Sequence, residues 1–242
     1  MFQSTQTDEY LQMCIHRARH EYLTWVEQAL DLIEQHQRPP GNGAQYRKSI
    51  NDIGCNLGQF WKGLIRRETL REWTYTGYDV EDAYLRAAKE VFPELSTRLR
   101  QLDIAREIPS EADISVASAV VEHLDNFVSG LENILRSSHE MVILRTFLGD
   151  ATILARRTQK GAVKSYPVNQ YSFSEVLGLF NSVGFATKVV RDNYTDSMPV
   201  FLDSADGAAL VRTQYVVVGT RPWEGDGNES VPERGPVPPI GI

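Results

Sequence analysis

The chain has 242 residues and a formal net charge of −7, and 42% of its residues are hydrophobic. This length suits one substantial domain or two small ones, and the composition is that of a globular protein. The acidic balance disfavours nucleic acid as a partner, because a general binder of its backbone needs a basic face. Two cysteines, Cys14 and Cys55, supply neither a disulfide framework nor a zinc quartet.

The first residues carry no basic segment followed by an apolar run, so we expect no signal peptide. No stretch reaches the roughly 18 uninterrupted apolar residues of a membrane-spanning helix, so we also expect no contact with a membrane interior. Together these patterns predict a cytoplasmic protein.

The N-terminal region has a helical pattern. Apolar residues recur at spacings near three, four and seven, up to the stretch "QHQRPPGNG" at 35–43: Leu11, Cys14, Ile15, Leu23, Val26, Leu30 and Ile33. We expect one long helical pattern here, forming a helical cap over residues 1–40.

From residue 48 onward, short apolar runs alternate with helical patterns. Strands are predicted at 48–53, 75–79, 98–103, 112–118 and 140–147, and helices follow most of them. Residues 149–171 are polar and show no periodicity. A helix then begins at a capping box formed by Ser172 and Glu175 and ends at Gly184.

Two closing strands, 186–193 and 213–221, follow without a helix between them, and residues 222–242 read as a disordered tail rich in Gly, Pro and acid. The pattern predicts an α/β fold with three layers, in which a mostly parallel sheet ends in an antiparallel hairpin. The domain is expected to span residues 45–221.

The stretch "NDIGCNLGQF" at 51–60 lies at a predicted strand-to-helix turn, where an open α/β sheet binds its ligand. Gly54 and Gly58 allow the backbone to approach that ligand closely. Asp79 follows Gly58 by about 20 residues, the distance at which an acid reaches a ribose. Neither a dinucleotide fingerprint nor a phosphate loop is present, so S-adenosylmethionine is the favoured ligand.

These residues resemble the motifs of Rossmann-like (class I) S-adenosylmethionine-dependent methyltransferases, whose first motif is commonly D-x-G-x-G-x-G. The middle glycine is Asn56 here, which tolerates a left-handed backbone. The resemblance covers roughly residues 45–148, although Ser137 and Ser138 replace a glycine-rich turn. It implies that the cofactor is held by Asp52, Gly54, Cys55, Asn56, Gly58, Asp79, Val80, Asp103, Ile104 and Ser118.

Methyl transfer from a sulfonium is an in-line displacement, in which the protein mainly positions the reactants. His123 is the candidate general base, because an imidazole takes a proton near neutral pH; the alternative is a packing role. Glu122 and His123 also resemble a metal-dependent group of RNA 3′-end methyltransferases, but Ala119 stands where that group has a glutamate ligand. We therefore expect no metal.

Additions to the core are expected to choose the acceptor. Aromatic residues of the N-terminal region, including Tyr10 and Trp25, form one such addition. Residues 145–171 are a possible lid that binds substrate through Arg145, Tyr166, Asn169 and Tyr171. The favoured acceptor is a polar small molecule, such as the hydroxyl of a sugar or secondary metabolite. A protein or RNA methyltransferase, a non-catalytic cofactor-binding module and an oligomer remain open.

Overall fold

The computed structural model describes residues 8–36, 48–158, 165–203 and 209–222. The expected disordered tail lies outside these residues, except for Pro222. The ends of the expected N-terminal cap, 1–7 and 37–40, and the middle of the expected lid, 159–164, also lie outside them. No helix of the described part is long and apolar enough to cross a membrane.

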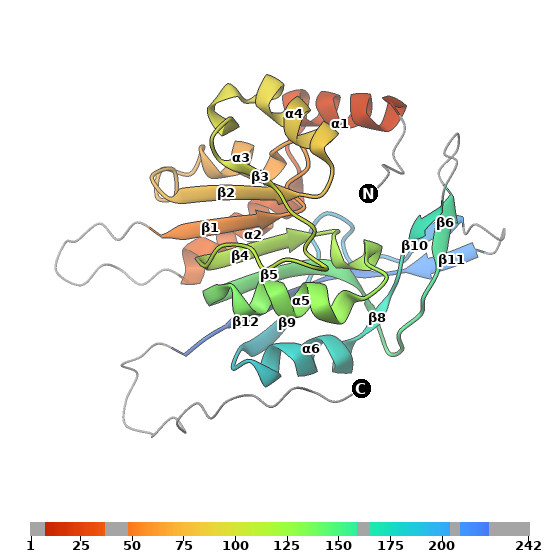
Figure 1. Ribbon diagram of the computed structural model, residues 1–242. Helices are drawn as coiled ribbons and strands as arrows, with labels where there is room; N and C mark the ends of the chain where they lie inside the picture. The colour runs from red at the N-terminus through yellow and green to blue at the C-terminus, as the bar shows by residue number, and fades with distance from the viewer. Residues whose placement is uncertain (1–7, 37–47, 159–164, 204–208, 223–242) are drawn as a thin grey trace.

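A twisted central sheet forms the middle layer (Figure 1). Its strand order is β3-β2-β1-β4-β5-β12-β9, and the short β8 pairs with the end of β5. Pairing is parallel from β3 through β5, whereas β12 runs antiparallel to both β5 and β9. The strands are β1 (Ser49–Ile53), β2 (Thr74–Asp79), β3 (Leu99–Gln101), β4 (Ala112–Ser118), β5 (Ser138–Gly149), β8 (Tyr171–Ser172), β9 (Ala186–Arg191) and β12 (Gln214–Thr220). The predicted α/β sheet with an antiparallel closing pair is confirmed.

Helices cover both faces of the sheet and bury two separate apolar clusters. The helices are α1 (Asp8–His20), α2 (Thr24–His36), α3 (Gln59–Leu64), α4 (Asp82–Val91), α5 (Phe127–Arg136) and α6 (Phe173–Ser182), with short 3-10 helices η2 (Pro93–Leu95) and η3 (Val121–His123). Apolar residues of α2, α3 and α4 pack with one face of the sheet. Those of α5 and α6 pack with the other face. The three layers follow from this alternation, because each strand points successive side chains to opposite faces.

The long N-terminal helical pattern is wrong in one respect, because the chain forms two helices, α1 and α2. Lys62 of α3 explains the break. Its Nζ donates hydrogen bonds to the carbonyl oxygens of Ala18, Arg19 and Glu21 at 2.9, 3.1 and 3.0 Å. These carbonyls at the end of α1 are therefore satisfied by a distant cation instead of by a continuing helix.

The segments on either side of the capped helix α6 contain short strands that the sequence pattern did not predict. Within 149–171, β6 (Arg156–Thr158) pairs antiparallel with β7 (Ser165–Pro167). Between the two closing strands, β10 (Val200–Asp203) pairs with β11 (Ala209–Arg212). Both two-stranded ribbons project beyond the carboxyl ends of β4 and β5 (Figure 1). They are too short to show an alternating hydrophobic pattern, which is why periodicity missed them.

Candidate cofactor and substrate site

The backbone of the glycine loop between β1 and α3 is left-handed at three alternate positions. The φ angles are +69° at Gly54, +49° at Asn56 and +83° at Gly58. Asn56 holds its strained conformation by accepting a hydrogen bond on Oδ1 from the backbone N–H of Leu57, at 2.8 Å. This bond explains how asparagine replaces the middle glycine of the motif.

Asp79 ends β2 beside this loop and ties it to the next strand. Its Oδ2 accepts a hydrogen bond from the backbone N–H of Asn56, and its Oδ1 accepts one from that of Glu81, both at 2.9 Å. Each carboxylate oxygen has two lone-pair sites, so both can accept a further bond from a ligand hydroxyl. Burial raises the pKa of Asp79 to about 6, although the backbone hydrogen bonds oppose this shift.

Asp52 lies on β1 just before the loop, buried with 3% of its surface exposed. Its Oδ2 accepts a hydrogen bond from the Tyr75 hydroxyl at 2.7 Å. The pKa of Asp52 is raised to about 7, mainly by burial; the Tyr75 hydrogen bond opposes this shift and the neighbouring Asp79 charge adds to it. The loop therefore lies beside two buried carboxyl groups, both of which have raised pKa values.

These carboxyl groups predict a pH dependence of folding. The pKa of Asp52 is higher in the folded chain than its value near 3.8 in a free side chain, so folding binds a proton between these values. The folded state should therefore lose stability, on the order of 2 kcal/mol, as pH rises from 5 to 8. Urea denaturation of wild type and Asp52→Asn at three pH values tests this, because asparagine does not titrate. A stability difference that stays constant with pH would contradict it.

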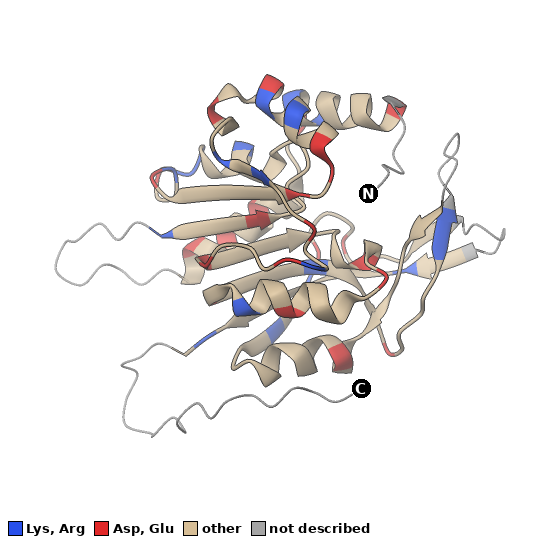
Figure 2. Ribbon diagram, viewed as in Figure 1, with Lys and Arg blue, Asp and Glu red and all other residues tan. Residues whose placement is uncertain are grey.

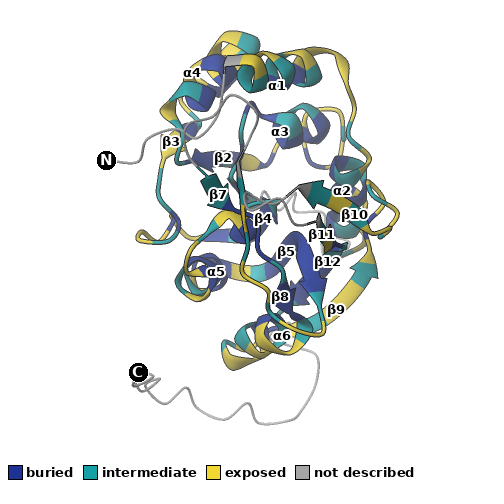
Figure 3. Cartoon of the chain, turned by 90° about the vertical axis from the view of Figure 1, so that its right-hand side faces the viewer, coloured by how far each residue is buried: buried dark blue, intermediate teal, exposed yellow. Residues whose placement is uncertain are grey.

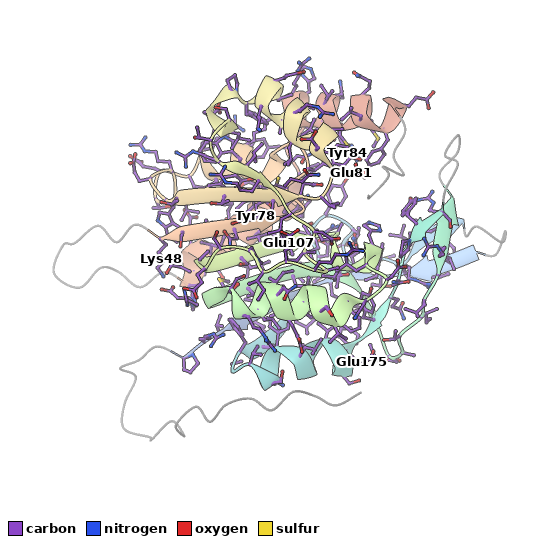
Figure 4. All side chains as sticks on the ribbon, viewed as in Figure 1. Lys48, Tyr78, Glu81, Tyr84, Glu107 and Glu175 are labelled. Atoms are coloured by element: carbon purple, nitrogen blue, oxygen red, sulfur yellow. The ribbon has the colours of Figure 1, made fainter. Side chains whose placement is uncertain are left out.

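A cavity of about 370 Å³ opens beside the loop at the carboxyl ends of β1, β2 and β4. One side carries the end of β2, the start of α4 and the segment after β3, including Asp79, Glu81, Tyr84, Asp103 and Ile104. Glu81 and Tyr84 lie next to each other at the start of α4 (Figure 4). The other side, which we call the lid side, consists of η3, the turn after it and the β6–β7 ribbon: His123, Leu124, Asp125, Arg156, Ser165, Tyr166 and Pro167.

A second cavity of about 200 Å³ lies on the α1–α2 side of the loop, and its walls include Arg17, Trp25, Asp52, Gln59, Ser118 and Tyr194. Four residues line both cavities: Tyr10, Gly54, Asn56 and Ala119. The cavities therefore meet over the glycine loop. Figure 3 looks onto this end of the sheet, where the buried strands lie between α1 and α4 on one side and α5 and α6 on the other.

His123 lies on the lid side of the larger cavity and is exposed. Its Nδ1 is 2.8 Å from the carbonyl oxygen of Pro167, and its ring centroid is 5.6 Å from that of Tyr166. A carbonyl oxygen can only accept, so Nδ1 carries the proton and Nε2 of the neutral ring keeps a lone pair. This is the tautomer that a general base at Nε2 requires.

Of the four residues predicted to bind substrate, only Tyr166 lines either of these two cavities. Asn169 and Tyr171 are buried. Tyr171 donates to the Val121 carbonyl at 2.8 Å, and Asn169 donates to the Leu124 carbonyl at 3.0 Å. These two side chains hold the η3 turn in place from behind.

Arg145 is also removed from the larger cavity. It is buried in a two-pronged ion pair with Asp192, with Nε–Oδ1 and Nη2–Oδ2 distances of 2.8 and 3.0 Å. Its Nη1 lies 3.5 Å from the Ser118 hydroxyl. The cation thus supports the end of β4 and is neutralised by its partner.

The predicted cofactor residues gather around the two cavities. Asp79, Val80, Asp103 and Ile104 line the larger one, while Asp52, Cys55 and Ser118 line the smaller one, and Gly54 and Asn56 line both. Gly58 is at the end of the loop that faces η2, and a Cβ added there would lie 2.8 Å from Leu95 Cδ1. Gly58 therefore serves the loop's packing against η2.

Arg17 of α1 and Tyr84 of α4 are cavity residues that the sequence did not single out. Each comes from a helix that contains no predicted cofactor residue, so only the packing of α1 and α4 beside the loop brings it close. Among the described residues, no three His, Cys, Asp or Glu side chains are grouped so that they could hold a metal ion.

The fold and the paired cavities define a Rossmann-like domain with a site for an adenosine-containing cofactor at the carboxyl ends of its strands. A family model described as a methyltransferase domain matches residues 51–139. The chain therefore contains a class I S-adenosylmethionine-dependent methyltransferase domain. The resemblance to this family is confirmed at this level.

Solved structures agree with the fold at low sequence identity. Magnesium protoporphyrin IX methyltransferase of Synechocystis PCC 6803, with bound SAM, has a TM-score of 0.52 and 13% identity over 91% of this chain and 87% of that one. Streptomyces venezuelae DesVI gives 0.54 and 12%, over 91% and 100%. The N-terminal domain of EvdMO1, with SAH and D-fucose present, gives 0.58 and 15%, over 91% and 100%. No curated protein matches the chain.

Proposed function

We propose that the protein transfers the methyl group of S-adenosylmethionine to an oxygen of a polar small molecule, such as a sugar or a secondary metabolite. The observation that carries this proposal is the pair of cavities that meet over the glycine loop. The larger cavity carries Asp79, the acid expected to bind the ribose, and the smaller cavity has partly aromatic walls. Two connected cavities suit a cofactor with an adenosyl part and a methionyl part. The acceptor would then reach the cofactor where the cavities meet.

The cofactor would lie with its ribose hydroxyls on Asp79 and its adenine near Asp103 and Ile104. Its methionine part would enter the smaller cavity, where Arg17 offers a cation for the carboxylate and Asp52 an acceptor for the ammonium group. Arg17 is half-buried, and its Nε lies 3.7 Å from Glu21 Oε2, which is too long for a strong hydrogen bond. Its guanidinium can therefore take a closer partner.

His123 would remove the proton of the acceptor hydroxyl through Nε2, while Pro167 holds the ring through Nδ1. The methyl group then moves in line from sulfur to oxygen, and the neutral thioether product leaves. Small-molecule acceptors also fit the structural neighbours, one of which is a protoporphyrin methyltransferase and another of which was crystallised with D-fucose. The β6–β7 ribbon forms part of the wall of the larger cavity, which suits a small acceptor better than a folded macromolecule.

Calorimetric titration of S-adenosylmethionine and S-adenosylhomocysteine into wild type and Asp79→Ala tests the cofactor assignment. Both ligands contain the ribose, so the variant should lose on the order of 1–3 kcal/mol of binding free energy for each. Asp150→Asn is the control, because Asp150 is exposed and lines neither cavity. If neither ligand binds to folded wild type, the proposed function is wrong.

The acceptor is tested by incubating the protein with labelled cofactor and pools of hydroxylated small molecules. Transfer of label to a low-molecular-weight product, reduced by a factor of roughly 100 or more in His123→Ala, is expected for a general base. Label found only in protein or RNA would contradict the small-molecule acceptor.

A further inference from the structure

Tyr10 occupies a special place in the site. It is one of the four residues that line both cavities, and the other three belong to the glycine loop and the end of β4. Tyr10 is the member of this set that comes from α1. It therefore faces the junction of the cavities from the side opposite the loop.

The position of Tyr10 is held by packing of α1. One and two turns further along α1, Cys14 and Ala18 form a buried cluster with Leu57 of the loop and with Tyr84 and Ala87 of α4. The Cys14 thiol is a hydrogen-bond partner of the Tyr10 hydroxyl. Lys62 fixes the far end of the same helix. Tyr10 thus belongs to a helix that packs against the glycine loop and whose C-terminus is held by Lys62.

The proposed cofactor joins its adenosyl and methionyl parts at one atom, the positively charged sulfur. If the adenosyl part fills the larger cavity and the methionyl part the smaller one, the sulfur lies where the two meet. We propose, on the basis of the function proposed above, that Tyr10 lies against the sulfonium and its methyl group and positions them for transfer.

Two properties of a neutral phenol suit this role. The electron-rich ring face attracts a cation, and the hydroxyl oxygen can accept a weak C–H···O contact from the polarised methyl group. Burial raises the pKa of Tyr10 well above its usual value, and the neighbouring Cys14 contributes in the same direction. The phenol therefore stays protonated and does not become a phenolate that would itself accept the methyl group.

This role has a consequence that simple packing lacks. The methylated cofactor is a sulfonium cation, whereas its demethylated product is a neutral thioether with the same adenosine and methionine groups. A side chain that only closes the cavity would contribute equally to both ligands. Tyr10 should instead favour the methylated form, and so help the product to leave after transfer.

Calorimetry with S-adenosylmethionine and S-adenosylhomocysteine tests this without knowledge of the acceptor. Tyr10→Leu should weaken binding of the methylated cofactor roughly 5- to 30-fold while changing that of the product less than about twofold. Tyr10→Phe keeps the ring and should fall between wild type and the leucine variant. Tyr84→Phe is the matched control: Tyr84 lines only the larger of these two cavities, so its change should affect both ligands equally.

A second measurement uses wild type alone, so it does not depend on how the variants fold. Cofactor labelled with ¹³C on the methyl group should show a changed methyl proton shift on binding: upfield where the methyl group lies over the ring face, and downfield where it contacts the hydroxyl oxygen. Equal weakening of both ligands in Tyr10→Leu, or a bound methyl resonance unshifted from the free one, would overturn the proposal for Tyr10. Failure of wild type to bind either ligand would instead refute the proposed function itself.

Discussion

Replacing Arg145 with methionine is expected to destabilise the fold by about 3–5 kcal/mol, because it leaves the buried Asp192 carboxylate without its partner. Asp192 is fully buried, and both of its oxygens accept hydrogen bonds from the Arg145 guanidinium. Gln214 accepts a further bond from the same group, and the Tyr194 ring lies 5.2 Å from the guanidinium carbon. The variant removes all of these contacts at once.

The pKa of Asp192 shows the same coupling. Burial by itself would raise this pKa, but the hydrogen bonds and charge of Arg145, with help from Thr195, lower it overall. A carboxyl group with a lowered folded pKa adds stability above its unfolded pKa, and that stability is lost as pH falls through the folded value. The cost of Arg145→Met should therefore be largest near neutral pH and shrink in acid.

Arg212→Met is the matched control, since it makes the same change at a second buried arginine. Arg212 is 3% exposed, and its Nε and Nη2 have no hydrogen-bond partner in the described structure; its Nη1 bonds the Val211 carbonyl. Removing an uncompensated buried charge should be neutral or stabilising, by roughly 1–3 kcal/mol. Chemical denaturation of both variants near neutral pH measures the contrast. Equal destabilisation by the two substitutions would show that the Asp192 pair is not the cause.

The strands and their order along the chain could be predicted because their signals are local. Residues 140–147 lie within β5 as predicted, since the run is short, apolar and rich in β-branched residues. The capping box also behaves as predicted: Ser172 accepts a hydrogen bond from the Glu175 backbone N–H at the start of α6. These features depend on residues a few positions apart.

Other features could not be predicted because they depend on contacts between distant residues. Periodicity continues from α1 into α2, and only Lys62, some forty residues further on, shows why the helix ends. The polar composition of 145–171 predicts hydrogen-bond donors for a substrate. Instead, Arg145 forms an ion pair with Asp192, and Asn169 and Tyr171 donate hydrogen bonds to carbonyl oxygens in and after η3. Figure 2 marks the basic positions of β6 on the ribbon that projects from the sheet, and the exposed Arg156 pairs with Asp125 on the lid side.

The glycine loop carries the other large expected effect. Gly54→Ala should destabilise the fold by about 2–4 kcal/mol and weaken cofactor binding at least tenfold. An alanine at φ +69° is strained by about 1–2 kcal/mol. Its Cβ would also lie 2.3 Å from Val120 Cγ2, so one of the two must move at a further cost of roughly 1–3 kcal/mol.

Val120 makes that movement harmful to the site as well as to stability. It lies between Ala119, which itself has a left-handed φ of +56°, and η3, which ends at His123. Ala119 and Val120 both line the larger cavity, so displacing Val120 changes the wall that faces the cofactor and shifts the start of η3. The loss of binding therefore follows from the same overlap that costs stability.

Gly184→Ala is the control that separates the backbone strain of a left-handed alanine from the steric overlap with Val120. Gly184 has a φ of +85°, but an added Cβ there meets no atom within 4 Å. This control should lose only the 1–2 kcal/mol of left-handed strain and keep cofactor affinity. A second change, Val120→Ala, should restore part of the stability and binding of Gly54→Ala by making room for the Cβ. Denaturation and calorimetry on wild type and these three variants test this. Equal losses at Gly54 and Gly184, or no rescue by Val120→Ala, would mean that the loop does not depend on this close approach.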